Sequence, residues 1–343
     1  IAGMHDEAGQ PCLLFRNEPW CNGAVWSLNP NPWLGSSERP APGQTPTNLA
    51  FNAASVHWNQ RIKERWYGPA AKGRLDGEYL NFRRAHFRDS TVPLTFDTAT
   101  ARPALFKGLA VQEFTQWISD DVHRLGRLMF ANGVPYRFTF LCPWLDVLGT
   151  ETDWLPGGQY RPPSDATMSL WRTMAGGKPY LLLMNSDYDK FTPELVERYF
   201  QRALFYGMWP GFFSHNASEN PYWQNPKWYE RDRPLFKKYI PIVRRVSEAG
   251  WQPVPHARCT NPQVWIERFG PDRRGAVYFT LFNPSGAPQT GQLMVETHEL
   301  GLRPPCTALE LVSNSSFDAP ATAWSFVLQP HETKVLNLLP ASN

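Results

Sequence analysis

The stretch SDATMSLWRTMAGGKPYLLLMNSDYDKFTPELVERYFQRALFYGMWPGFFS, residues 164–214, alternates helical and strand patterns. Residues 164–177 predict a helix that glycines end, and PYLLLMN (179–185) predicts a buried strand. Thr192 is suited to cap a second helix, which runs up to Gly207 and precedes a short strand, MWPGFFS (208–214). This alternation predicts a parallel sheet covered by helices.

The alternation of predicted strands and helices continues toward both ends of the chain. The pattern predicts further strands at 24–29, 77–82, 137–142 and 253–257, and further helices at 48–66, from Phe114 to a stop at Gly133, and at about 234–250, the last interrupted by Pro241. No glycine-rich phosphate-binding motif opens any of these helices, which disfavours a nucleotide-binding fold. We therefore expect a (β/α)8 barrel. Only six of its eight strands are found, and we expect the first units to lie upstream of Ile1 rather than within the loops.

From Val264 onward, short segments rich in β-branched and aromatic residues alternate with Pro, Gly and Asn turns. This pattern is typical of an all-β antiparallel sandwich. The sequence thus predicts a catalytic barrel domain over residues 1–260 and a C-terminal β-sandwich domain over residues 261–343.

Composition limits the classes of partner. The 34 Lys and Arg barely exceed the 31 Asp and Glu, which argues against a nucleic-acid surface, and no apolar run is long enough to span a membrane. The five cysteines form no CxxC pair, so a zinc site is not expected. No motif requires another metal or a cofactor; Asp187 and Asp189 could bind a calcium ion, but two acids are too few to predict one. Two glycosylation sequons, at Asn216 and Asn314, leave the compartment open, with a secreted or periplasmic location favoured.

Polar and aromatic side chains follow the predicted strands, at the edge where barrel enzymes hold their sites. Carboxylates there predict catalysis, since glycoside hydrolysis uses a pair of carboxyl groups. The candidate catalytic residues are Asp76, Glu78, Asp146 and Glu151. Amides, a histidine and indoles suit sugar hydroxyls and ring faces. The candidate substrate-binding residues are Trp33, Trp144, Trp154, Asn185, Asp187, His215, Asn216 and Trp223.

Each candidate also has a purely structural interpretation. Asp76 precedes Gly77 and could end a turn, Asp146 could cap one, and Glu151 could be a solvated loop acid. Asp187 could be a loop acid before a helix, and His215 an ordinary hydrogen-bonded histidine. Their joint placement after successive strands favours the functional interpretation.

The segments DGEYLNFRRAHF, PWLDVLGTETDW, KPYLLLMN and FYGMWPGFFSHNASENPYW, in this order, resemble large bacterial barrel proteins of the glycoside hydrolase type. The resemblance covers roughly residues 20–330 and includes a C-terminal β-sandwich. In α-glycosidase-like barrels an Asp nucleophile ends the fourth strand and an acid/base Glu ends the fifth. By position, the resemblance implies Asp76 or Glu78 as nucleophile and Glu151 as acid/base, with Asp146 or Asp187 assisting and with retention of configuration.

Three hypotheses follow. The favoured one is a glycoside hydrolase acting on an oligosaccharide, polysaccharide or glycoconjugate. The second is a carbohydrate-binding protein without catalysis. The third is a structural subunit whose barrel is completed by an N-terminal segment or by another chain.

Overall fold

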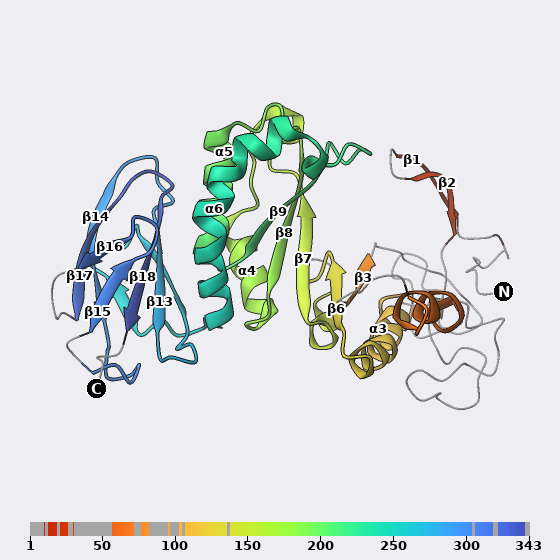
Figure 1. The fold of residues 1–343 in the computed structure, drawn as a ribbon, viewed down its shortest axis with the longest axis horizontal. Helices are drawn as coiled ribbons and strands as arrows, with labels where there is room; N and C mark the ends of the chain where they lie inside the picture. The colour runs from red at the N-terminus through yellow and green to blue at the C-terminus, as the bar shows by residue number, and fades with distance from the viewer. Residues whose placement is uncertain are drawn as a thin grey trace. The chain divides into compact units, whose positions relative to one another are not determined.

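The computed structural model describes residues 10, 13–18, 21–26, 30, 57–71, 77–81, 95–96, 103–104, 107–135, 138–303, 306–317 and 322–339. The chain forms two compact units, Ile1–Gly149 and Thr150–Asn343. Figure 1 shows the elements of both units coloured along the chain.

The first unit contains parallel strands, helices and two small antiparallel pairs. The strands β3 (Gly77–Asn81), β6 (Leu128–Asn132) and the start of β7 (Val147–Thr152) pair in parallel. The antiparallel pairs are β1 (Leu13–Glu18) with β2 (Cys21–Trp26), and β4 (Thr95–Phe96) with β5 (Pro103–Ala104). The helices are the π-helix η1 (Trp58–Lys63), α2 (Glu64–Tyr67), α3 (Lys107–Arg124) and the 3-10 helix η2 (Thr139–Trp144). The predicted barrel strand at 24–29 is therefore wrong in its described part, because β2 belongs to a hairpin.

A buried carboxylate fixes the helices of this unit to one another. Asp121 of α3 is 1% exposed. It accepts hydrogen bonds from Trp58 Nε1 at 2.8 Å, Lys63 Nζ at 2.9 Å and Arg124 Nη2 at 2.8 Å. Three donors offset the cost of removing this charge from water.

Two predictions fail between residues 124 and 152. The helix expected to reach Gly133 ends at Arg124, and Leu128–Asn132 forms β6. The strand expected at 137–142 is the 3-10 helix η2, and the strand of this region is β7. Between residues 138 and 145 the buried side chains are Phe138, Leu141, Cys142 and Leu145. Their spacing of three and four residues is that of one helical face and not the alternation of a strand.

The second unit begins with an α/β part. It contains η3 (Pro156–Gly158), α4 (Asp165–Ala175), β8 (Tyr180–Ser186), α5 (Pro193–Phe205), β9 (Trp209–His215), η4 (Tyr222–Gln224) and α6 (Pro226–Ala249). β8 and β9 pair in parallel, with Leu181 opposite Trp209. The predicted cap Thr192 is confirmed, since its hydroxyl accepts from Leu195 N at 3.5 Å. Ser164 caps α4 in the same way and accepts from Thr167 N at 3.2 Å. α6 starts earlier than predicted and continues through Pro241.

The second unit ends in two antiparallel sheets. A six-stranded sheet has the order β10-β12-β13-β18-β15-β16, and a three-stranded sheet has the order β11-β14-β17. Side chains of both sheets, including Phe279, Leu293, Trp324 and Leu336, form one buried apolar cluster. The strands are β10 (Trp251–Gln252), β11 (Ala257–Cys259), β12 (Trp265–Phe269), β13 (Val277–Phe282), β14 (Gln289–Val295), β15 (Thr307–Glu310), β16 (Ser315–Phe317), β17 (Ala323–Leu328) and β18 (Thr333–Leu339).

The predicted barrel strand at 253–257 is wrong, because β10 and β11 both belong to the antiparallel sheets. A mixed α/β fold with parallel strands followed by antiparallel sheets is confirmed. Among the described residues, the parallel strands are β3, β6, β7, β8 and β9, fewer than the eight of a closed barrel. Barrel closure and the boundary at residues 260/261 stay predictions.

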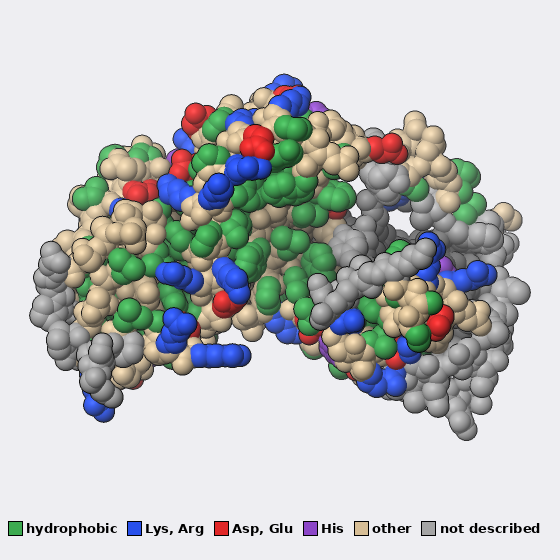
Figure 2. All heavy atoms as spheres, in the orientation of Figure 1, with side chains coloured by type: hydrophobic (Ala, Val, Ile, Leu, Met, Phe, Trp, Pro, Cys, Tyr) green, Lys and Arg blue, Asp and Glu red, His purple; other side chains and the backbone are tan. Residues whose placement is uncertain are grey.

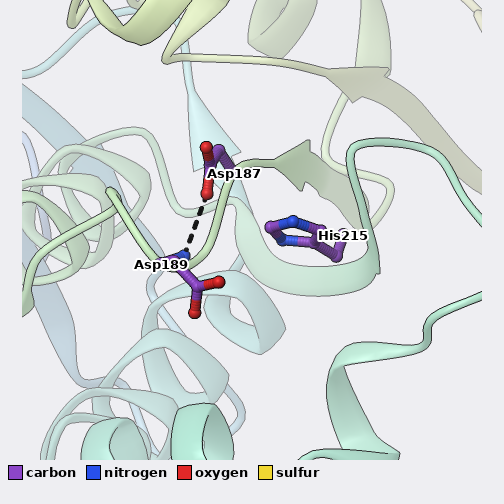
Figure 3. Close-up of side chains that lie close together, drawn as sticks. All are labelled: Asp187, Asp189 and His215. Carbon is purple, nitrogen blue, oxygen red and sulfur yellow. Dashed lines mark hydrogen bonds between the residues drawn. The ribbon is translucent and has the colours of Figure 1, made fainter.

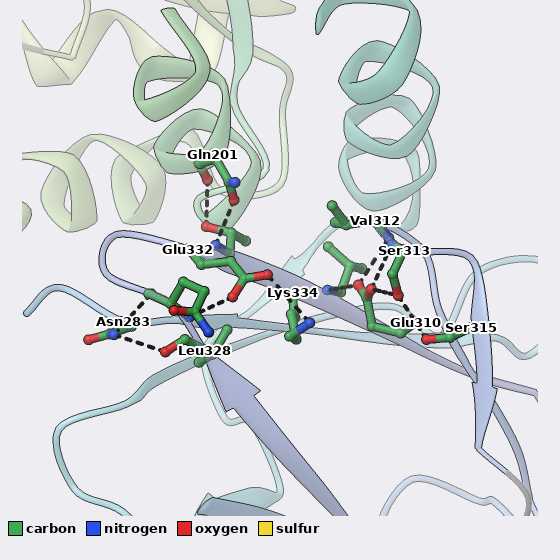
Figure 4. A network of polar contacts seen from close by, with 12 residues as sticks. Gln201, Asn283, Glu310, Val312, Ser313, Ser315, Leu328, Glu332 and Lys334 are labelled. Atoms are coloured by element: carbon green, nitrogen blue, oxygen red, sulfur yellow. Dashed lines mark hydrogen bonds and ion pairs between the residues drawn. The ribbon is translucent and has the colours of Figure 1, made fainter. Parts of the chain in front are cut away.

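Hydrogen bonds fix the antiparallel sheets to α5 within the second unit. Thr333 of β18 donates through its backbone N–H to Gln201 Oε1 at 2.6 Å and through its hydroxyl to Gln201 O at 2.7 Å (Figure 4). Thr280 of β13 donates to Phe205 O at 2.7 Å. On the surface over α5 and α6, hydrophobic side chains are interspersed with Lys and Arg (Figure 2). Among the described helices, none combines the length and apolar character needed to cross a membrane.

Candidate functional site

The candidate site lies at the carboxyl ends of β8 and β9 and at the end of β7, all within the second unit. Ligands bind at this edge of parallel sheets because the loops after the strands converge there. The structure brings five of the predicted residues together in two groups at these strand ends. One group is Glu151 with Asn185, and the other is Asp187, His215 and Asn216.

Asn185 connects the ends of three strands. Its side chain is 8% exposed, and its Oδ1 accepts from the backbone N–H of Ser214 at 3.1 Å and from the Ser214 hydroxyl at 3.2 Å. Because the backbone N–H of Ser214 can only donate, the Asn185 atom that faces it must be the amide oxygen. The Nδ2 group therefore faces Glu151 and donates to its Oε1. Glu151 itself is exposed, so a carboxylate that solvent can reach is held in a defined orientation by a buried amide.

His215 ends β9 and is fixed by a backbone donor and an indole. Its Nδ1 accepts from the backbone N–H of Tyr188 at 3.2 Å, so the neutral ring carries its proton on Nε2. The ring stacks on Trp228, with centroids 5.0 Å apart and an interplanar angle of 17°. Asn216 Nδ2 lies 3.2 Å from Nε2, and since both of these nitrogens would be donors, the amide of Asn216 must turn its oxygen toward Nε2 to accept the ring proton. These contacts place one ring N–H and one amide together beyond the strand end.

Asp187, Asp189 and His215 form the group of described residues that could hold a metal ion (Figure 3). Each offers one ligand atom, and these atoms lie within 4.8 Å of one another. Both carboxylates already have cationic partners, since Lys190 Nζ lies 3.0 Å from Asp187 and Lys227 Nζ lies 2.9 Å from Asp189. An ion bound here would compete with both lysines for the two carboxylates.

Hydrogen bonds keep these two acids ionised. Burial raises the pKa of Asp187, but the hydrogen bond from Lys190 and its positive charge outweigh that effect, and the pKa is lowered. The hydrogen bond from Lys227, followed by that from the Trp228 indole at 2.8 Å, lowers the pKa of Asp189. At neutral pH both carboxylates are therefore acceptors for the hydroxyl groups or cations of a ligand.

The predicted tryptophans differ in exposure. Trp154 is completely buried, packs edge-on against Tyr199 at 4.8 Å, and has Arg202 5.7 Å from its ring centre. It is a core residue, and the prediction that it stacks on a sugar is corrected. Trp144 ends η2 in the first unit, where it is half-buried and its carbonyl accepts from Ser119 at 2.6 Å.

Trp223 is 54% exposed and lies in the connection that leaves β9. It lines a pocket together with Tyr229, Arg233 and Phe236. The last three residues are spaced by four and three positions on one face of α6. The Trp223 ring meets Phe236 at 5.0 Å, so packing fixes its position while leaving much of it open to solvent.

Asp146 does not occupy the position after a strand that the sequence predicted for it. It precedes β7 instead of following a strand, and its Oδ2 accepts from the backbone N–H of Met129 at 2.7 Å. The same oxygen lies 2.7 Å from His123 Nε2. These contacts connect β6, α3 and the start of β7, which gives Asp146 a structural role in the first unit.

Three candidates cannot be located by their side chains. Asp76 and Trp33 lie outside the described residues. Glu78 lies in β3, of which the structure describes the backbone alone. The predicted nucleophile therefore stays a prediction. Conversely, sequence reasoning missed Trp228, whose only signal is its place in the first turn of the helix after β9.

Comparisons with known proteins give the fold. No protein-family model matches the chain. No curated protein matches it in sequence. Among solved structures, a maltogenic α-amylase from Thermotoga neapolitana matches 99% of this chain and 72% of its own, with a TM-score of 0.53 and 10% identity. This similarity shows a glycoside hydrolase-like fold.

Two further solved structures are less similar. An α-galactosidase from Mortierella vinacea has a TM-score of 0.42 and 9% identity, covering 69% of this chain and 64% of its own. A β-L-arabinopyranosidase from Geobacillus stearothermophilus has a TM-score of 0.32 and 14% identity, covering 81% of this chain and 87% of its own.

Proposed function

We propose that this protein is a glycoside hydrolase that acts on an oligosaccharide, polysaccharide or glycoconjugate. The observation that carries the proposal is the exposed carboxylate of Glu151, oriented by the buried amide of Asn185 at the edge where strand ends converge. Such a carboxyl group can deliver a proton to the oxygen of a leaving sugar. The glycoside hydrolase-like fold supports the same class.

In this proposal Glu151 is the acid/base residue. The second carboxyl group comes from the β3 region, where Asp76 or Glu78 is the nucleophile, and the reaction retains the anomeric configuration. Asn185 is a positioning residue for Glu151, because it fixes the carboxylate and does not itself reach the scissile bond.

The remaining polar groups bind the substrate. The Nε2–H of His215, the amide of Asn216 and the carboxylate of Asp187 are donors and acceptors for sugar hydroxyls. The exposed Trp223 offers an apolar face on which a pyranose ring can stack. Because Trp223 lies beyond the polar groups along the same connection, we propose a substrate of more than one sugar unit.

The fold expected for this function is a closed (β/α)8 barrel over residues 1–260 with a β-sandwich over residues 261–343. The described parallel strands supply part of that barrel, and we propose that further strands come from an N-terminal segment or another chain.

Hydrolysis of α- and β-linked aryl glycosides and natural glycans tests the proposal, with NMR identifying the anomer released first. We expect release from one linkage class with retained configuration. No release from any substrate by a folded, soluble chain would overturn the enzymatic assignment.

A carbohydrate-binding protein without catalysis is the second candidate, and the exposure of Trp223 favours it. Calorimetry with the glycans of the same panel distinguishes the two. Heat of binding without any released sugar would support this second candidate.

A further inference from the structure

A second pocket of the same unit lies apart from the candidate site, where α5 faces the loops of the antiparallel sheets. Its walls include one carboxylate, Asp165, together with Tyr160, Arg198, Arg202, Phe282, Pro284 and His331. It contains about 490 Å³ of empty space, part of it open to solvent. None of these residues belongs to the candidate site at the ends of β7, β8 and β9.

The pocket carries an excess of positive charge. Arg202 is 8% exposed and pairs with Asp165, with Nε 3.0 Å from Oδ1, and donates to Pro163 O at 2.7 Å. Arg198 lies one turn earlier on the same face of α5. Within the described parts of the chain, Arg198 has neither a carboxylate partner nor a hydrogen bond. Among the residues that line the pocket, one negative charge, on Asp165, therefore stands against two positive charges, on Arg198 and Arg202.

The titration of a neighbouring histidine reflects this charge. Burial lowers the pKa of His331, and the positive charges of Arg198 and Arg202 lower it further, against the opposing effect of Asp165. A ligand with a negative charge would meet a favourable potential here.

Hydrogen bonds hold the wall that carries His331. The turn between β17 and β18 is closed by Gln329 N–H donating to Glu332 Oε2 at 2.6 Å. Asn283 donates to Gln329 O at 3.0 Å, and Gln201 of α5 accepts from Thr333, the residue after Glu332, at 2.6 Å (Figure 4). His331 itself has φ 60°, in the left-handed region that non-glycine residues rarely adopt. The surrounding contacts keep this conformation, as is common at ligand sites.

We propose that this pocket binds a small organic anion, a carboxylate or a phosphate ester, through the guanidinium of Arg198. The planar guanidinium matches the oxygens of either group with two parallel hydrogen bonds. Phe282, Pro284 and Tyr160 supply apolar surface for the carbon skeleton of the ligand, which is why the site suits an organic anion better than a free inorganic one. This inference is independent of the proposed hydrolase activity.

Three probes with one ring and different charge test it, namely glucose, glucuronate and glucose 6-phosphate, titrated by calorimetry at constant ionic strength. We expect at least one anion to bind and glucose to bind far more weakly. Binding of glucuronate alone identifies a carboxylate site, and binding of glucose 6-phosphate alone identifies a phosphate site. Dissociation constants above about 10 mM for both anions would overturn the proposal.

Variants assign the binding to this pocket. Arg198→Gln should weaken binding at least about 10-fold, because the charge-assisted hydrogen bonds are lost. Arg198→Lys keeps the positive charge and should weaken binding less. Arg244→Gln is the matched control, because Arg244 is an exposed arginine paired with Glu248 at 2.8 Å on α6. Glu151→Gln should leave this binding intact. Equal affinities of the wild type and Arg198→Gln would refute the assignment.

Discussion

At the scale of single residues, the amide of Asn185 determines the geometry of the candidate site. It joins the backbone of β9 to the carboxylate at the end of β7, and it is itself buried. The sequence predicted Asn185 as a site residue because it ends an apolar strand. It predicted Glu151 because that residue follows the strand expected at 137–142, which is the 3-10 helix η2, whereas Glu151 lies in β7. It could not predict their connection through Ser214, which depends on the pairing of β8 with β9.

Substitution of this amide should cost stability as well as orientation. In Asn185→Ala the buried N–H of Ser214 loses its acceptor, and we expect the free energy of unfolding to fall by about 1–3 kcal/mol. Urea unfolding measures it. Ser214→Ala is the control, because it removes the hydroxyl and keeps the backbone bond, so its loss should be smaller. Equal losses in the two variants would contradict the assigned role of the amide.

Asp272 gives a residue-scale prediction for pH. Burial raises the pKa of this carboxyl, but the N–H groups of Ala276 and Arg274 and the hydroxyl of Tyr278 outweigh burial and lower it from 3.8. A lowered pKa in the folded state stabilises the protein above the unfolded value, and this contribution is lost as the pH falls through the folded pKa.

We therefore expect the stability difference between the wild type and Asp272→Asn to be constant near neutral pH and to shrink as the pH falls below 3.8. Urea unfolding over the pH range in which the protein stays folded measures this difference. A difference that does not change with pH would show that the carboxylate is not preferentially stabilised in the fold.

At the scale of elements, helices with strong end signals were predicted well. Ser164 and Gly176 bound α4, and Thr192 and Gly207 bound α5, as their sequences indicate. The segment 124–152 was predicted badly for two reasons. Leu125 and Met129 are spaced as in a helix although the chain turns at Gly126, whose φ is +68°. The apolar run at 138–142 also fits either a strand or a short helix, and only its packing decides.

Gly207 shows how closely α5 approaches the antiparallel sheets. A Cβ atom at this position would lie 2.4 Å from Cε1 of Phe269. Gly301 has the same φ, +65°, but nothing within 4 Å of its Cβ position. Comparing alanine variants at these two positions therefore separates the cost of the left-handed backbone conformation from the cost of the contact with Phe269.

Gly301→Ala should lower the free energy of unfolding by about 1–2 kcal/mol, the cost of a left-handed alanine. Gly207→Ala should lose a further 1–3 kcal/mol or so, because Phe269 must move. Thermal or urea unfolding of both variants measures the difference. If the two variants were equally stable, the close approach of Phe269 would be refuted.

At the scale of the whole molecule, the sequence predicted the order of the two kinds of structure, parallel α/β and then antiparallel sheets. It could not predict that α5 and the sheets belong to one compact unit, because Gln201 and Thr333 are 132 positions apart. The two halves of this unit should therefore lose their structure together.

Gln201→Ala tests this coupling. It leaves the buried N–H of Thr333 without an acceptor and should cost about 1–3 kcal/mol. Hydrogen exchange should then accelerate by a similar factor in β8 and in β18. Gln263→Ala, at an exposed position, is the control and should change neither strand. Faster exchange confined to β18 would show that the two halves open separately.

The central claim is that Glu151 is the acid/base residue of a glycoside hydrolase, and the most direct test is the hydrolysis rate of Glu151→Gln on the best substrate of the wild type. We expect a fall of about 10²–10⁴-fold with the fold unchanged by circular dichroism, since an amide cannot supply a proton. Glu248→Gln, at an exposed glutamate of α6, should retain the wild-type rate. Full activity of Glu151→Gln would contradict the account, because the carboxylate that Asn185 orients would then take no part in the reaction.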